Sequence, residues 1–202
     1  MSFPLLILPP SIEWAQNTAA ATTTWGDIGD WDVSGVADFS YAFSTNRDAT
    51  GGTSVTNGNL KAATFVGTAM SKWIMTSATT LELTFYGASE MNSNLSGWNV
   101  AKVTSLHQTF REASKFTGTG LATWDTASVT HLNYVFFKAG KFNGDISGWD
   151  TGKVTDIDSF ATNSGLNQDL SKWNIQKCNR FNGLASLGAM DACNKRKLAL
   201  SW

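Results

Sequence analysis

A tryptophan recurs along this chain at a nearly constant interval. The intervals are 25, 26, 25 and 24 residues, and they separate Trp73, Trp98, Trp124, Trp149 and Trp173. Trp31 precedes this series by 42 residues, which corresponds to one period plus an insertion. A period in this range is typical of repeat arrays, in which each unit stacks on its neighbours.

Other apolar positions keep the same phase. An aliphatic side chain stands three residues before each tryptophan: Ile28, Met70, Leu95, Leu121, Ile146 and Leu170. A phenylalanine closes five of the units: Phe43, Phe85, Phe110, Phe136 and Phe160. Six units with one apolar skeleton predict a single repeat domain, because a unit of this size buries its apolar face only against its neighbours.

Two periodicities alternate inside each unit. Helical spacing, i, i+3, i+7, is found at Val103, Leu106 and Phe110. The run NGDISGW predicts a short strand, with Ile146 facing inward and Asp145 and Ser147 facing outward. The predicted fold class is therefore an α/β repeat: a right-handed solenoid like that of leucine-rich repeats. It has about six coils, each a short parallel strand plus a helical turn, with helical caps at both ends.

The repeat pattern divides the chain into three parts. Residues 1–24 form an N-terminal lead and cap, with a short helix from Ile12 to about Thr18 and a loop over 19–24. Residues 25–185 form the repeat domain, with an insertion at 44–64 that is either a functional loop or a tolerated insertion on an inert edge. Residues 186–202 are expected to form a C-terminal capping helix, for which Asp191 offers an N-cap.

Composition excludes several classes of protein. A net charge of -1 and a pI near 6.1 give no basic footprint, so we expect no nucleic-acid partner. We expect no transmembrane segment and no signal peptide, because the apolar run at residues 3–8 is short and no basic residue precedes it. Cys178 and Cys193 could close one disulfide loop, or Cys178 could fill an inward position that valine fills elsewhere.

No constellation typical of catalysis, metal binding or cofactor binding stands out. The only histidines, His107 and His131, fall at different phases of the repeat, so we expect polar residues on an outer turn rather than a catalytic base or a zinc site. The tryptophan row could stack sugars, but its phase with the aliphatic residues predicts a core role. The predicted repeat core is Trp31, Trp73, Trp98, Trp124, Trp149, Trp173, Phe85, Phe110, Phe136 and Phe160.

Carboxylates and amides form two rows. One row follows the tryptophans directly and comprises Asp32, Asn99, Asp125, Asp150 and Asn174. The other precedes them, with serines two residues on, and is the candidate binding face: Asp27, Asn94, Ser96, Asp145, Ser147, Asp169 and Ser171. Stacked coils would turn each row into a ladder that could attract calcium. The alternative is that these side chains accept hydrogen bonds from backbone amides at turns.

The units FNGDISGWDTGKVTDIDSF and LNQDLSKWNIQKCNRF resemble the repeats of BspA-like leucine-rich-repeat surface proteins, a family with tryptophan and phenylalanine repeats of about 25 residues. The resemblance covers residues 25 to about 185. It implies a leucine-rich-repeat-like solenoid at the cell surface or secreted, used for adhesion and protein binding, and no catalytic residue. The chain departs from the pattern in its degenerate second unit, around Trp73, and in the signal peptide, which we do not expect in this sequence.

The sequence therefore predicts a non-enzymatic interaction, adhesion or structural protein. We expect it to bind a protein partner through the candidate binding face and the 44–64 loop. Two alternatives stay open: a glycan-binding module that uses the same Asn/Asp/Ser stripe, and a fixed subunit of a larger assembly that docks through residues 3–8.

Overall fold

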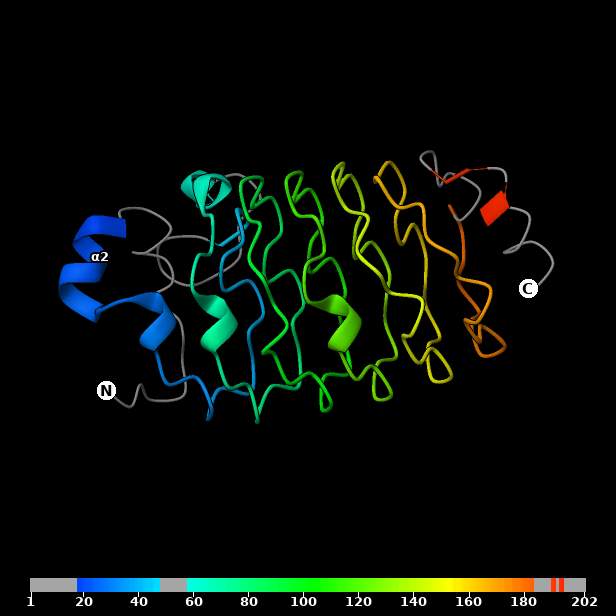
Figure 1. The fold of residues 1–202 in the computed structure, drawn as a ribbon, viewed down its shortest axis with the longest axis horizontal. Helices are drawn as coiled ribbons and strands as arrows, with labels where there is room; N and C mark the ends of the chain where they lie inside the picture. The colour runs from blue at the N-terminus through cyan, green and yellow to red at the C-terminus, as the bar shows by residue number, and fades with distance from the viewer. Residues whose placement is uncertain (1–17, 48–57, 184–189, 192, 195–202) are drawn as a thin grey trace.

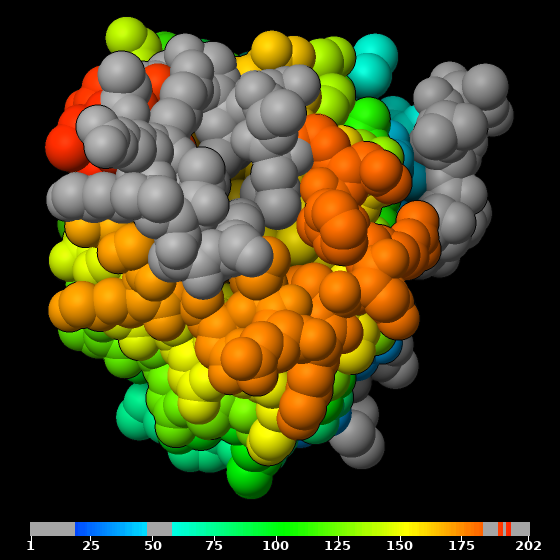
Figure 2. All heavy atoms as spheres, turned by 90° about the vertical axis from the view of Figure 1, so that its right-hand side faces the viewer, coloured from blue at the N-terminus to red at the C-terminus, as the bar shows by residue number. Residues whose placement is uncertain are grey.

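The computed structural model describes residues 18–47, 58–183, 190–191 and 193–194. Over these residues the chain winds into coils that lie one against the next along the long axis of the molecule (Figure 1). The colour order in Figure 1 shows that neighbours in sequence are neighbours in the stack. Figure 2 looks along this axis from the C-terminal side, with the later coils in front of the earlier ones.

Backbone hydrogen bonds join each coil to the next. In one such set, the amides of Leu83, Phe85 and Gly87 donate to the next coil, to the carbonyls of His107 at 2.9 Å, Thr109 at 2.9 Å and Arg111 at 2.8 Å respectively. The same pattern repeats one period later. Only isolated parallel bridges form between neighbouring coils in the described residues, one for each pair, and they link Asp38, Thr80, Ser105, His131, Asp156 and Arg180 in that order.

Left-handed backbone explains why these hydrogen bonds leave the coil. Ten residues after each tryptophan of the row, φ is positive, at Tyr41, Leu83, Gln108, Tyr134, Ser159 and Gly183, and five of these six residues are not glycine. A second such position, four residues later, is held by Gly87, Glu112, Lys138 and Asn163. An α-helix cannot continue through a left-handed residue. The amides are therefore turned away from the i−4 carbonyls of their own coil and towards the carbonyls of the next one.

The predicted fold class is wrong. The described residues contain no strand longer than a single bridge and one α-helix, so coils built from a strand and a helical turn are not present. The inward spacing at Val103, Leu106 and Phe110 is real, since all three are fully buried, but consecutive turns produce it instead of a helix. The predicted strand at Ile146 is likewise a turn region.

The short helical elements are 3-10 turns. Three of them, η1 (Ile28–Asp30), η3 (Met70–Lys72) and η4 (Leu121–Thr123), lie at the same level of the first, second and fourth coils of the stack (Figure 1). Each ends at a tryptophan of the row. The fourth, η2 (Leu60–Thr64), belongs to the predicted insertion, of which residues 48–57 lie outside the described part.

The α-helix, α2 (Thr18–Trp25), covers the N-terminal end of the described stack (Figure 1). The prediction of a loop over 19–24 is therefore wrong. Three consecutive alanines favour helix, and the hydroxyls of Thr23 and Thr24 donate to carbonyls four residues earlier at 3.0 and 3.1 Å. The predicted helix from Ile12 lies almost wholly outside the described residues. The predicted C-terminal capping helix over 186–202 lies largely outside the described residues; within them, the Asp191 carboxylate accepts the backbone N–H of Asn194 at 2.8 Å.

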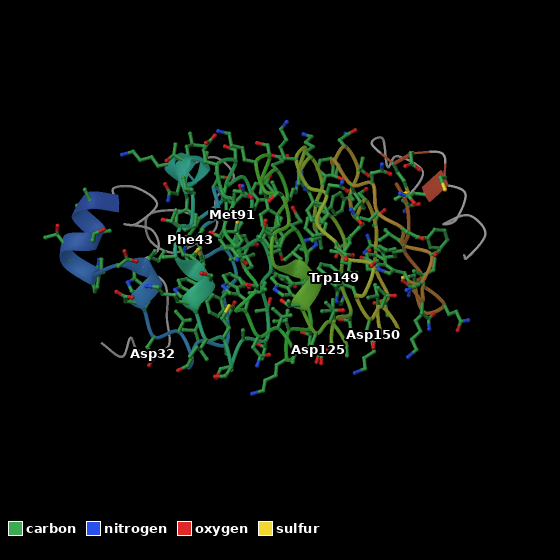
Figure 3. The ribbon with its side chains drawn as sticks, viewed as in Figure 1. Asp32, Phe43, Met91, Asp125, Trp149 and Asp150 are labelled. Atoms are coloured by element: carbon green, nitrogen blue, oxygen red, sulfur yellow. The ribbon has the colours of Figure 1, made fainter. Side chains whose placement is uncertain are left out.

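The tryptophans form a continuous buried row. Successive rings from Trp31 to Trp173 are stacked nearly parallel, with centroids 5.9 to 6.3 Å apart. Each indole N–H beyond the first coil donates to the carbonyl of the aliphatic residue in the preceding coil, as Trp124 does to Leu95 at 3.2 Å and Trp149 to Leu121 at 3.0 Å. Figure 3 shows Trp149 inside the stack. Because each ring is covered by its neighbours, the row fills the interior and offers no open face for a sugar.

A phenylalanine row runs beside the tryptophans. Its rings at Phe43, Phe85, Phe110 and Phe136 are stacked at 5.6 Å, and Phe160 meets Phe136 edge-on at 5.4 Å. A further buried row, which the sequence reading did not identify, consists of Phe65, Met91, Phe116, Phe142 and Leu166. Figure 3 shows Phe43 and Met91 in the upper part of the interior. The signal for this further row in the sequence is the apolar residue 17 or 18 positions after the tryptophan in the later units.

Candidate binding surfaces

The candidate binding face lies at the surface, but one side-chain oxygen of each of its Asp and Asn residues is already used in a turn. The Oδ1 atoms of Asp27, Asn94, Asp145 and Asp169 each accept the backbone N–H of the residue two positions later, at 2.7 to 3.0 Å. In the third of these turns the Ser147 hydroxyl also donates to Asp145, at 2.8 Å. Ser96 is exposed, and Ser147 and Ser171 are half-buried. In units without an Asx residue here, Ala69 and Gly120 adopt left-handed backbone instead.

Hydrogen bonds of this kind lower the pKa of one carboxylate in each of the two rows. The backbone N–H of Ser147 and then its hydroxyl hold the pKa of Asp145 below the usual range, because both bonds favour the charged carboxylate. In the other row, the Ser34 hydroxyl and backbone N–H similarly lower the pKa of Asp32. Both carboxylates are therefore anions at neutral pH with part of their accepting capacity used by the chain itself.

The second carboxylate and amide row has the same local role. Each of Asp32, Asn99, Asp125, Asp150 and Asn174 accepts the backbone N–H two residues later, at 2.8 to 3.1 Å. Figure 3 shows Asp32, Asp125 and Asp150 along one edge of the stack. In the described part of the chain, no three His, Cys, Asp or Glu side chains gather so that they could hold a metal ion.

Two further polar rows lie where the coils bridge, and we call them together the bridge face. The first consists of the bridge residues Asp38, Thr80, Ser105, His131, Asp156 and Arg180. The second lies two residues further along each coil and consists of Ser40, Glu82, His107, Asn133, Asp158 and Asn182. In each coil one residue stands between the two rows, and it is buried in every coil from Phe39 to Ile157. Hydrogen bonds join the rows across coils, as from the Ser105 hydroxyl to Glu82 at 2.6 Å.

Both histidines lie on the bridge face. His131 is exposed and makes a 2.8 Å contact between its Nδ1 and the Thr130 hydroxyl. His107 is half-buried, and its Nε2 lies 2.7 Å from the side-chain nitrogen Nε2 of Gln108. The outer helical turn on which the sequence reading placed them is not present.

Arg111 lies at the centre of an aromatic cluster beside the bridge face. Its guanidinium carbon is 5.0 to 5.5 Å from the ring centroids of Phe137, Tyr86 and Tyr134. Tyr86 belongs to the preceding coil, and Tyr134 and Phe137 belong to the next one. One guanidinium nitrogen donates to Gln108 Oε1 at 2.9 Å. We call these five residues the Arg111 cluster. The ring of His107 meets that of Tyr134 edge-on at 6.5 Å, so the cluster continues into the bridge face.

Some buried polar atoms of the bridge face have no hydrogen-bond partner. In the described part of the chain these include Nδ1 of His107, Oδ1 of Asn133 and Oδ1 of Asp158. The three residues occupy the same position in three successive coils. Asp156, by contrast, is paired with Arg180 at 3.2 Å.

A shallow pocket of about 310 Å³ lies near the N-terminal end of the stack. Trp31, Val33 and Ile74 supply its apolar part, and Asp30 and Lys72, paired at 3.3 Å, supply its charged part. Ile74 is 65% exposed and stands where other units carry the turn-forming Asp or Asn.

The two cysteines are free thiols. The Cys178 thiol is half-buried and donates to the Val154 carbonyl at 3.3 Å, while Cys193 is exposed. Burial, and to a smaller extent the charge of Asp156, raises the pKa of Cys178. The disulfide that the sequence left open is not formed, and Cys178 packs against the core beside Val154.

A family model described as "Mycoplasma protein of unknown function, DUF285" matches residues 15–118 and 105–189 of the chain. The two matches together span most of the sequence and coincide with the repeated units. The chain belongs to this family. DUF285 membership supports a repeat protein, and the finer resemblance to BspA-like leucine-rich-repeat proteins is not part of what the match shows. No curated protein and no solved structure matches the chain.

The described part of this DUF285 chain contains no helix with the length and apolar character required to cross a bilayer. This agrees with the expectation of no transmembrane segment. Neither the Arg111 cluster nor the second row of the bridge face was predicted from the sequence. A signal for that row exists, because a polar residue recurs nine positions after each tryptophan.

Proposed function

We propose that this chain is a non-enzymatic repeat protein that binds a protein partner, and that the partner contacts the bridge face and the Arg111 cluster. The Arg111 cluster carries the proposal. Tyrosine and arginine are the residue types enriched in the energetic centres of protein interfaces, where they are held in place before the partner arrives.

Three features support this location over the candidate binding face. The guanidinium of Arg111 is fixed among three rings, so little side-chain freedom remains to be lost on binding. Tyr86, Tyr134 and Phe137 are only half-buried, so a partner can still cover them. The candidate binding face instead consists of turns whose Oδ1 atoms accept hydrogen bonds from their own chain. Its role in binding, like that of the 44–64 loop, stays a prediction.

Site-specific photo-crosslinking tests the proposal. A photoreactive phenylalanine analogue is placed at Phe137 in the Arg111 cluster and, as a matched control, at Lys153, an exposed residue in the turn that follows Asp150. In the native cells we expect one defined crosslinked partner from position 137 and none from position 153. Equal crosslinking at both positions, or none at 137, would contradict the location.

The resemblance to BspA-like proteins supports a setting for this binding, adhesion at a cell surface. Protease treatment of intact cells tests it, because a surface-exposed chain is cleaved while an internal marker is spared. Protection of the chain to the same degree as the marker would exclude the surface. Glycan binding and a fixed place in an assembly stay predictions, and the segment 3–8 that would dock in the latter case lies outside the described residues.

A further inference from the structure

The last described coil ends in backbone donors that no later coil satisfies. In each earlier coil, the residue eight positions after the tryptophan donates its backbone N–H to the bridge residue of the next coil, as Ile157 does to Arg180 at 2.9 Å. A second N–H, two residues further on, also donates to the next coil. Phe181 and Gly183 are the equivalent residues of the last coil, and within the described residues neither N–H has an acceptor. We call residues 179–183 the C-terminal edge.

The side chain at the centre of this edge is also uncovered. Phe181 is 57% exposed. Its equivalents in the earlier coils, each covered by the coil that follows, are at most 1% exposed: Phe39, Leu81, Leu106, Leu132 and Ile157. Figure 2 views the molecule from this end. Unpaired backbone groups beside an exposed aromatic ring form an edge to which another chain can add.

The earlier coils show which kind of segment fits such an edge. Four of the segments that pair with it share one pattern, a threonine, a polar residue, leucine or isoleucine, and a second polar residue, at 79–82, 104–107, 130–133 and 155–158. All of them run parallel to the coil before. The threonine N–H donates back to that coil, as from Thr155 to the Thr130 carbonyl at 2.9 Å. The Asn179 carbonyl is the equivalent acceptor at the C-terminal edge.

The charge at the edge favours an acidic residue in the added segment. Arg180, the last bridge residue, pairs with Asp156 of the preceding coil at 3.2 Å, and its side chain is still 62% exposed. The bridge position of a segment added in parallel would lie next to Arg180 on its other side. Opposite charges at neighbouring positions of paired chains stabilise the pairing, so aspartate or glutamate suits this position.

We infer that the C-terminal edge binds an extended segment of a protein partner, parallel to residues 179–183, with an acidic residue beside Arg180 and an aliphatic residue over Phe181. This goes beyond the proposed function, because the Arg111 cluster takes no part in the site. A second copy of the chain stacked head to tail does not fit, because Phe39, the equivalent residue of the first coil, is fully buried and leaves no open edge.

A peptide titration on the full chain tests the inference. The probe is acetyl-Val-Thr-Asp-Ile-Asp-Ser-amide, which reproduces residues 154–159, titrated into the ¹⁵N-labelled protein and followed by NMR. The matched control probe has asparagine in place of isoleucine and keeps the same charge. We expect saturable downfield shifts of the Phe181 and Gly183 amides with the first probe, and binding at least tenfold weaker with the second. Equal affinities, or no saturable shift at either amide, would overturn the inference.

Variants of protein and probe localise the contact. Phe181→Ala should weaken the first probe at least fivefold, and it should fold because this side chain is exposed. Ile74→Ala, which trims another exposed apolar side chain in the second coil, should leave the affinity unchanged. A probe methylated on its threonine nitrogen removes one backbone donor without changing the protein, and should bind at least tenfold more weakly. Unchanged affinity in folded Phe181→Ala, or with the methylated probe, would overturn the site.

Hydrogen exchange in the free protein tests whether the edge is open. The Phe181 and Gly183 amides should exchange rapidly, while those of Ile157 and Ser159, bonded at 2.9 and 2.7 Å, should be protected. Protection of the edge amides that rises with protein concentration would assign the edge to a second copy, and protection at every concentration to the chain's own C-terminal residues. Either result would overturn the inference. The crosslink at position 137 reports on the proposed function alone, so its loss with the peptide still bound contradicts only that proposal.

Discussion

At the scale of single residues, the two carboxylate and amide rows stabilise turns. Each Asx oxygen satisfies a backbone amide that no regular secondary structure satisfies, and the position recurs in nearly every coil. A stack built from turns has many such amides, which explains why Asp, Asn, Ser and Thr are placed so regularly along the chain.

The turn at Asp145 predicts a measurable shift in titration. Ser147→Ala removes the hydroxyl that donates at 2.8 Å but keeps the backbone N–H, so the pKa of Asp145 should rise part of the way towards the ordinary value of about 3.9. NMR titration of the side-chain carboxyl carbon measures it. In the wild type, the stability from this turn is present above that ordinary pKa and is lost as the pH falls through the lower pKa of the folded state. An unchanged pKa in the variant would show that the hydroxyl makes no contribution.

The two thiols should differ in reactivity. Cys178 has a raised pKa, partial burial and a hydrogen bond to Val154, while Cys193 is exposed. Because the thiolate is the reactive form, iodoacetamide near pH 8 should label Cys193 first, and denaturant should make the two rates similar. Mass spectrometry of timed digests follows both sites. Equal rates in the native protein would contradict the placement of Cys178.

At the scale of elements, the coils depend on left-handed turns. Gly87 has φ of 70°, and a Cβ there would overlap the Thr45 side chain. Gly87→Ala should lower the free energy of unfolding by about 1–3 kcal/mol, because it adds backbone strain and a clash. Gly140 has ordinary backbone, and a Cβ added there would meet no atom within 4 Å, so Gly140→Ala is the matched control and should be neutral or slightly stabilising. Denaturant unfolding compares them, and equal losses would contradict the turn geometry.

The sequence could predict the repeat but not the backbone inside it. Inward residues at i, i+3 and i+7, as at Val103, Leu106 and Phe110, arise equally from a helix and from successive turns, so the spacing does not discriminate. The residues that decide between a helix and successive turns, such as Leu83 and Tyr134, are not of a type that favours left-handed backbone, so their identity does not predict it. Their conformation follows from hydrogen bonds to the next coil, which is a tertiary effect.

The features of the candidate sites also differ in how far the sequence predicts them. Turn formation by Asp145 and Asp150 was one of the two alternatives for their rows, because it depends on residues two positions apart. The burial of Asn133 and Asp158 could not be predicted, since it depends on packing between coils and the type of polar residue at this position changes from unit to unit.

At the scale of the whole molecule, each coil is incomplete without its neighbours. A tryptophan covers the ring of the preceding coil and donates to its backbone, so packing and hydrogen bonding stabilise the same interface. The cross-coil ion pairs, such as Lys115 with Glu90 at 2.6 Å, are exposed and add little by comparison. The interior of the described coils is thus occupied by the aromatic rows, and the binding that we propose uses the outer surface.

A tryptophan in the middle of the stack should therefore carry a large share of stability. Trp124→Phe keeps a ring but leaves the Leu95 carbonyl without its donor, and should cost about 1–3 kcal/mol. Trp124→Ala should cost about 3–5 kcal/mol, because it also creates a cavity. Ile74→Ala, at a 65% exposed site, should stay within about 0.5 kcal/mol. Equal effects of all three in denaturant unfolding would show that the row is not the core.

The most direct test of the stacked coils is a nuclear Overhauser measurement on the indole N–H groups. The structure predicts that the Trp98, Trp124 and Trp149 indole protons each lie near the backbone of Met70, Leu95 and Leu121 respectively, 28 or 29 residues earlier. Cross-peaks between each indole proton and the preceding coil would support the account. Indole protons that show cross-peaks only within their own coil, or that exchange at once with solvent, would contradict it.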